Sequence, residues 1–136
     1  MKGVSPLLSY ATMFVIGIFA ASLILFSISN ILNDLEKRSI LSEMDYVIEN
    51  IRKEILVLYF SNVNEGKVNL SIPTTIADKK YLIEFLPKRI RMKINFKGEI
   101  LEKERKVNIT ANLSGISYPP ASIYLKRNQN VLMKLI

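Results

Sequence analysis

The sequence lacks cysteine, histidine and tryptophan, and it holds only five glycines and five prolines in 136 residues. Without cysteine, neither a disulfide framework nor a thiolate metal site can form, and without histidine the commonest metal ligand and proton shuttle is missing. A serine nucleophile would need a lysine or carboxylate base, and no local motif supplies one. We therefore expect no enzymatic activity, no metal and no cofactor.

Charge is also missing from a long stretch near the N-terminus. After Lys2 the next ionisable side chain is Asp34, which leaves 31 uncharged residues from Gly3 to Asn33. The chain beyond Asn33 holds 18 of the 19 basic residues and all 12 acidic ones, for a net charge of +6. Composition thus divides the chain into an apolar N-terminal part and a water-soluble remainder.

The apolar part is long enough to cross a membrane. Leu7 to Leu32 is an apolar run of 26 residues, against the roughly 20 that a helix needs to span the hydrocarbon core. A secretory signal peptide has an apolar region of only about 7 to 15 residues, so we expect this segment to be retained. Small residues at Gly17 and at 20–22 would let neighbouring helices approach closely. Because Lys2 lies on one side and nearly cancelling charges on the other, the positive-inside rule places the N-terminus in the cytoplasm.

A second helical pattern follows the apolar run. From Ile40 to Tyr59 apolar residues recur at helical spacing on one continuous face, with charged residues on the other. We expect helix over 4–60, with a membrane part at 7–32 and an amphipathic part at 34–60. Ser5 and Pro6 suit a helix start, so the regular helix is predicted to begin at Pro6. A break between Asn30 and Asp34 is the alternative to one continuous helix.

Residues 61–136 have the pattern of a β-rich domain. Alternating apolar and polar residues indicate strands, most clearly at Arg89 to Phe96, which a turn at 97–98 would follow. The other candidate strands are Val68 to Ile72, Tyr81 to Leu86, Val107 to Leu113, Ser122 to Lys126 and Val131 to Ile136. The predicted fold class is therefore α+β: a long N-terminal helix followed by a small antiparallel β-sheet or β-sandwich.

A stripe of cations lies along the clearest of these strands. Its members are Arg89, Arg91, Lys93 and Lys97. A row of cations on one strand face concentrates anions, so the stripe is a candidate anion-binding site. Glutamates at 99, 102 and 104 lie across the turn, where they can neutralise it, and no aromatic residues alternate with the cations as base stacking would require. We do not expect a nucleic-acid partner.

Three N-x-S/T sequons occur in the β-rich part. They begin at Asn69, Asn108 and Asn112. The last two have the polar parity of their predicted strand, so both side chains would point outward, as glycan acceptors must. We expect an exposed, glycosylated extracellular surface.

The first residues, Met1-Lys2-Gly3-Val4-Ser5-Pro6, followed at once by the apolar helix, resemble those of archaeal type IV pilins and related pilin-like proteins. In that family a basic residue and a glycine precede the membrane helix, and a dedicated prepilin peptidase cuts after them. The matching cut lies between Gly3 and Val4, so residues 1–3 would be a short leader. Bacterial type IV pilins carry a glutamate where this chain has Leu8, and its absence here is typical of the archaeal branch.

The resemblance implies a structural subunit that forms a homo-oligomeric filament through Leu7 to Leu32, aided by assembly machinery. Subunits would wait in the membrane with the N-terminus in the cytoplasm and the C-terminal domain outside, and would become extracellular on assembly. Two other functions remain open. One is a membrane-anchored accessory protein of an archaellum or pilus machine that does not polymerise, and the other is an anchored anion-binding or adhesion module.

Overall fold

The computed structural model describes residues 4–136. Its elements are α1 (Val4–Phe60), β1 (Glu65–Asn69), β2 (Tyr81–Leu86), β3 (Arg89–Phe96), β4 (Glu99–Lys106), β5 (Asn112–Ser117), β6 (Ser122–Arg127) and β7 (Val131–Leu135). The predicted α+β class is confirmed, with the strands in one seven-stranded sheet rather than in a two-sheet sandwich. By internal contacts the chain forms two compact units, Met1–Arg38 and Ser39–Ile136. The last part of α1 belongs to the second unit.

The helix has no break. It is continuous through Asn30 and Asp34, where the sequence left a break open, and it begins at Val4, two residues before the predicted start at Pro6. Proline lacks only its own backbone N–H, which is unbonded within the first turn in any case, so Pro6 is tolerated inside that turn.

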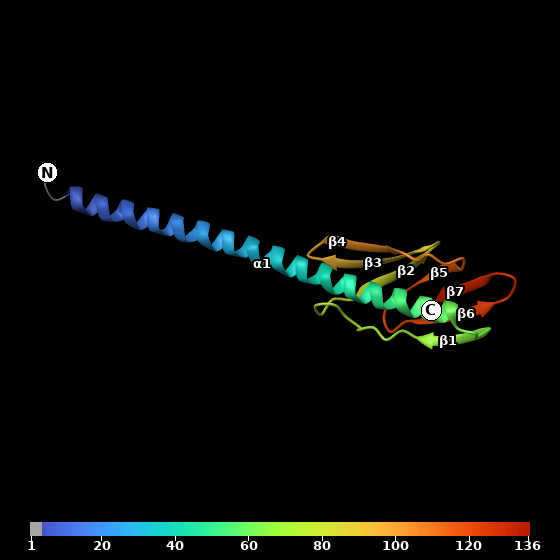
Figure 1. Ribbon diagram of the computed structural model, residues 1–136. Coiled ribbons are helices and arrows are strands. Elements are labelled where there is room, and N and C mark those ends of the chain that lie inside the picture. The colour runs from blue at the N-terminus through green and yellow to red at the C-terminus, as the bar shows by residue number, and fades with distance from the viewer. Residues whose placement is uncertain (1–3) are drawn as a thin grey trace. The chain divides into compact units, whose positions relative to one another are not determined.

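The sheet has the strand order β1-β6-β7-β5-β2-β3-β4, and the part of α1 that belongs to the second unit, from Ser39 on, lies along one face of it (Figure 1). Five of its six strand pairs are antiparallel, whereas β5 and β7 are parallel. The sequence predicted an antiparallel sheet and missed this parallel pair. Alternation within a strand does not indicate the direction of the neighbouring strand. The sheet is therefore mixed.

Helix and sheet enclose one core. The helical contribution consists of Ile40, Met44, Val47, Ile48, Ile51 and Ile55, which follow helical spacing and are all at most 2% exposed. The sheet presents the alternate residues of β2, β3, β6 and β7, such as Ile83, Met92 and Leu125. These helical residues are those of the amphipathic face that the sequence shows between Ile40 and Tyr59.

Two strand predictions were wrong at their boundaries and one strand was missed. Residues 107–111 alternate in burial as predicted, but the N–H of Ile109 bonds locally to the carbonyl of Val107, so the strand begins only at Asn112. Strand β1 ends at Asn69, so only the first two of the five residues predicted from Val68 to Ile72 belong to it. The missed strand is β4, an edge strand with one buried residue, Leu101, among mostly charged neighbours.

The C-terminal end of α1 is capped by a side chain from the sheet. The Arg127 Nη2 atom donates to the carbonyl oxygen of Tyr59 at 2.7 Å, and the N–H of Ser61 bonds to the carbonyl of Val57 at 3.0 Å. A cation at this end also complements the helix dipole. No basic residue of the last helical turn provides this cap, so the sheet supplies it.

Candidate functional site

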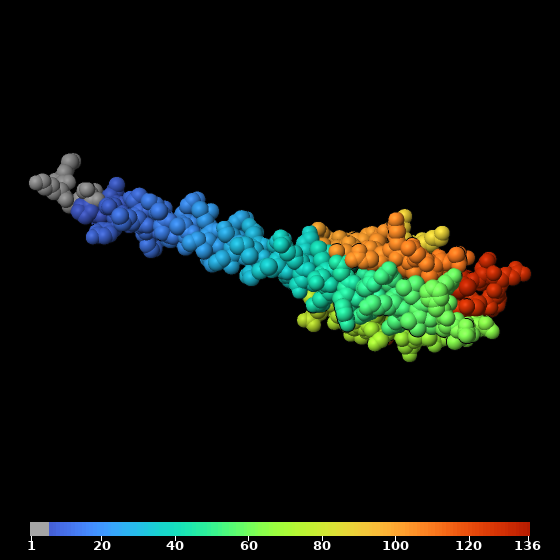
Figure 2. Space-filling view, in the orientation of Figure 1, coloured from blue at the N-terminus to red at the C-terminus, as the bar shows by residue number. Residues whose placement is uncertain are grey.

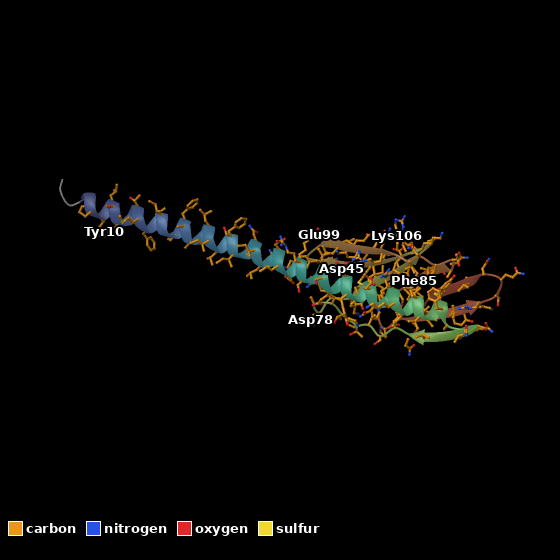
Figure 3. All side chains as sticks on the ribbon, in the orientation of Figure 1. Tyr10, Asp45, Asp78, Phe85, Glu99 and Lys106 are labelled. Atoms are coloured by element: carbon orange, nitrogen blue, oxygen red, sulfur yellow. The ribbon has the colours of Figure 1, made fainter. Side chains whose placement is uncertain are left out.

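The first part of α1 exposes its apolar side chains on every side. Between Leu7 and Leu35 seventeen large apolar residues are all at least 47% exposed, and Phe14 reaches 70%. Successive helical residues are about 100° apart, so runs of four such as 13–16 and 23–26 point in all directions. The sticks in Figure 3, where Tyr10 is labelled, show these side chains around the helix. We call Leu7 to Leu35 the apolar segment.

Three hydroxyl groups in the apolar segment are satisfied within the helix itself. The hydroxyl groups of Thr12, Ser22 and Ser27 donate to backbone carbonyls four residues earlier, at 2.5, 2.8 and 2.9 Å. A hydroxyl bonded in this way carries no unsatisfied donor into an apolar environment. By length and composition the helix is able to cross a membrane, and its most apolar stretch is 0% buried within the chain.

The apolar segment gives way to charged residues at its C-terminal end. Arg38 Nε lies 3.0 Å from Asp34 Oδ2, one helical turn away, and both side chains are exposed. Gly17 lies mid-segment, and a Cβ atom built there meets no described atom within 4 Å. Nothing within the described part of the chain therefore requires glycine at this position.

The predicted cleavage site is described only at its last residue. Val4 is the first residue of α1. Lys2 and Gly3, the other two residues of the predicted site, lie outside the described residues.

The predicted cation stripe lies on the sheet face opposite α1, where glutamates meet it. Arg91 contacts Glu104 at 2.5 Å and Glu102 at 2.9 Å, and their carboxylates come from the adjacent strand β4. Hydrogen bonding from Arg91 lowers the pKa of Glu104. Arg89 also reaches Glu104, Lys93 reaches Glu84, and Lys97 packs against the ring of Phe96. The stripe is thus a network of paired charges.

The three sequon asparagines are all exposed but differ in their surroundings. Asn69 Oδ1 accepts a hydrogen bond from the Ser122 hydroxyl at 2.8 Å. Asn108 lies in the loop between β4 and β5, and Asn112 is the first residue of β5. The structure places each where a glycan would meet solvent, and glycosylation itself stays a prediction.

Two polar contacts between α1 and the sheet were not predicted. Asp45 on the helix accepts hydrogen bonds from Lys103 at 2.8 Å and from Arg105 at 3.0 Å, both in β4. In the space-filling view β4 lies directly beside this part of the helix (Figure 2). The mixed charges along residues 99–106 are the only sequence signal for this contact, and they do not identify a partner. Within residues 4–136 no three His, Cys, Asp or Glu side chains form a group that could hold a metal ion.

A scan against protein-family models, a search of curated proteins and a search of solved structures each found no match for this chain. The architecture itself, a long apolar N-terminal helix followed by a seven-stranded mixed sheet, is type IV pilin-like. The exposed apolar segment is suited to packing against partners or lipid.

Proposed function

We propose that this chain is a structural subunit of an extracellular type IV pilus-like filament, and not an enzyme. One observation carries the proposal: the apolar segment is exposed around its whole circumference. A helix that is apolar on all sides belongs in a membrane or in the interior of a larger assembly. A bilayer provides the membrane environment, and a filament whose core is built from these helices provides the interior of an assembly.

The polar character of the segment fits both environments. Because the hydroxyls of Thr12, Ser22 and Ser27 bond to their own helix, these three need no water and no partner. Lipid tails are as apolar as the helix, so the move from bilayer to filament depends on tight packing between helices. Gly17, whose Cβ position has no described atom within 4 Å, provides a place for close approach.

In this proposal a membrane peptidase removes residues 1–3, and the mature chain begins at Val4. The apolar segment first holds the subunit in the membrane with the second unit on the extracytoplasmic side. Assembly machinery then extracts it, and the sheet units form the outer surface of the filament. The exposed sequon asparagines would lie on that outer surface.

The test is intact mass and N-terminal sequencing of the protein from native membranes and, separately, from sheared extracellular material. A polymerising subunit is expected to begin at Val4 in the sheared fibres. A Gly3→Val variant should stay uncut and remain in the membrane, because it replaces the glycine that precedes the cut in the family that this chain resembles. Gly17→Ala, with a change of similar size beyond the cleavage site, is the control for cleavage and should still be cut.

Chains that keep Met1 and occur only in membranes would overturn the filament proposal. That result would support the alternative function, an anchored accessory protein that does not polymerise. Such a protein also needs an apolar membrane helix. A processed chain that never appears outside the cell would likewise contradict polymerisation.

A further inference from the structure

Charges on the outer face of the sheet, the face opposite α1, separate into two groups. The cations in the middle of β3 are paired with glutamates from β2 and β4. A second group has no acidic partner within 4 Å among residues 4–136, and all its members are exposed: Lys67, Lys106, Lys126 and Lys134. Three of these lysines therefore lie on β1, β6 and β7, away from the stripe that the sequence indicates, and Lys106 lies opposite Arg89 at one end of that stripe.

Strand register aligns three of these lysines, from β1, β4 and β7, in one row across the outer face of the sheet. Lys67 of β1 lies opposite Tyr124 of β6, which lies opposite Lys134 of β7. Lys134 is beside Ser114 of β5. On the other half of the sheet Lys106 of β4 lies opposite Arg89 of β3, which lies opposite Leu86 of β2. Leu86 follows Phe85, the partner of Gly115 in β5, so it is level with Ser114.

These residues form a row that crosses all seven strands. At about 4.8 Å between strands the row extends over roughly 29 Å. Lys126 lies in the neighbouring row, between Glu65 of β1 and Leu132 of β7. We call Lys67, Lys106 and Lys134, together with the adjoining Lys126, the lysine row. Figure 3 labels Lys106 at the end of β4 opposite Glu99.

A depression of about 640 Å³ adjoins the lysine row at the β6–β7 turn. It is lined by Lys126, Asn112, Asn128, Gln129, Asn130 and Leu132. Each carboxamide offers both donors and an acceptor. None of the four carboxamide side chains has a hydrogen-bond partner in the described part of the chain, and no acidic residue lines the depression.

From these two features we propose that the outer face, along the lysine row and its depression, binds an acidic polysaccharide. Lysine ammonium groups pair with the carboxylate or sulfate groups of a linear polyanion. The carboxamides are placed to bond its sugar hydroxyls. Tyr124 is the only aromatic residue in the row between Lys67 and Lys106, and its hydroxyl donates to Glu65, so the face offers no series of rings for stacking bases. This composition favours a saccharide over a nucleic acid.

The inference does not depend on polymerisation, since every residue involved belongs to one copy of the second unit. The depression adjoins Arg127, whose bond to the carbonyl of Tyr59 places it at the end of the sheet where α1 finishes. It is formed by strands and turns that the core holds in place, with Leu125 and Met133 buried beside the exposed Lys126 and Leu132.

The experiment measures binding of the full chain in detergent micelles to polygalacturonate, a linear polyuronate, with neutral dextran as the control polymer. Expression in a host without N-glycosylation keeps the depression open at Asn112. The double variant Lys67→Ser/Lys134→Ser should bind polygalacturonate about tenfold more weakly at low salt. Its logarithmic salt dependence should fall by about one to two, since two cations are lost.

The matched control is Lys53→Ser/Lys80→Ser, which removes two exposed lysines outside the lysine row and depression. This variant should bind polygalacturonate as the unmodified chain does, within about twofold. A third variant, Gln129→Ala/Asn130→Ala, should weaken binding about threefold without changing the salt dependence. Circular dichroism verifies that each variant is folded.

Several results would overturn the proposal. If the two double lysine variants lost equal affinity for polygalacturonate, binding would depend on net charge and not on the lysine row. Equal binding of dextran, or no effect of either the lysine-row or the carboxamide variant, would remove the acidic saccharide as the ligand. Tighter binding of a short DNA duplex than of polygalacturonate would indicate a nucleic-acid surface instead.

Discussion

The two parts of α1 have similar apolar residues but opposite environments. Between Ile40 and Ile55 the large apolar side chains lie on one side of the helix and are buried against the sheet, while Tyr46 on the other side is 69% exposed. In the apolar segment the same residue types occur on every side, and none is covered. Periodicity, and not apolar content, distinguishes a helix that completes its own core from one that needs lipid or other subunits.

The largest expected effect comes from placing the same change in both parts. Ile48→Asp puts a carboxylate at a site with no exposure, and an unpaired buried charge costs more than about 4 kcal/mol. That cost approaches the whole stability of a typical domain, so we expect the second unit to lose its folded structure in circular dichroism and limited proteolysis.

Ile24→Asp, in the apolar segment, should leave unfolding of the second unit unchanged within about 0.5 kcal/mol. It should instead reduce retention in membranes during alkaline extraction, because an aspartate at the centre of a membrane helix costs about 2.5 to 3.5 kcal/mol. If Ile24→Asp also unfolded the sheet, the two parts of α1 would not be independent.

The next prediction tests whether close packing between β5 and β7 requires a glycine in the sheet. Gly115 has φ +118°, and a Cβ atom there would lie 2.4 Å from the carbonyl oxygen of Leu135 on the parallel neighbour β7. Gly115→Ala should therefore lower the free energy of unfolding by about 3 kcal/mol in chemical denaturation.

Gly98→Ala is the matched control for the sheet glycine, because Gly98 also has positive φ but open space around it. It should cost only the conformational penalty of about 1 kcal/mol. Equal effects of the two substitutions would show that close packing between β5 and β7 is not what requires glycine.

Alkaline pH tests the core of the second unit. Burial raises the pKa of Tyr81 to about 12, and its hydroxyl donates to the carbonyl of Pro73. A raised pKa means that the folded state retains the proton longer, so stability should be unchanged below the usual value of about 10 and should fall from there to about 12.

Tyrosine absorbance and unfolding curves measured together should show the loss of stability at alkaline pH, and Tyr81→Phe should reduce it. The substitution itself should cost about 1 kcal/mol near neutral pH, because it removes one hydrogen bond. If Tyr81→Phe lost the same stability at alkaline pH, titration of other groups would be the cause of that loss. Membrane retention through the apolar segment should not change in Tyr81→Phe.

The smallest effect concerns the ion pairs that join the helix to the edge strand. Asp45→Asn removes the charge that Lys103 and Arg105 contact, but the Asp45 side chain is 35% exposed. We expect a loss of about 0.5 to 1 kcal/mol that decreases in high salt. Glu43→Gln, at an exposed position with no partner in the described chain, should change stability by less than about 0.3 kcal/mol. If Asp45→Asn and Glu43→Gln changed stability equally, the ion pairs with β4 would not be the cause.

Much of the fold follows from local pattern. The buried helical face and strands β2 and β3 could be read directly from the sequence, because alternation and helical spacing record which side faces a core. The apolar segment was evident from its lack of charge. Strand β4 was missed because an edge strand buries little, and β5 was misplaced because residues 107–111 alternate in burial without pairing.

The candidate surfaces were harder to predict than the fold. The cation stripe follows one strand and is visible in the sequence, but its pairing depends on the register of β2 and β4. The lysine row combines residues from β1, β4, β6 and β7, which only the strand order and register bring together on one face of the sheet. Sequence spacing contains no trace of that row.

The sequence by itself determined that one segment must leave water and that the remainder can fold around a helix, because composition and periodicity decide solvation locally. The tertiary structure alone decided which charges neutralise each other, since ion pairing depends on distances of a few ångströms between strands far apart in the chain. It also decided that Arg127 caps α1 and that β5 pairs in parallel with β7. Those features depend on how the elements pack, which no single stretch of residues encodes.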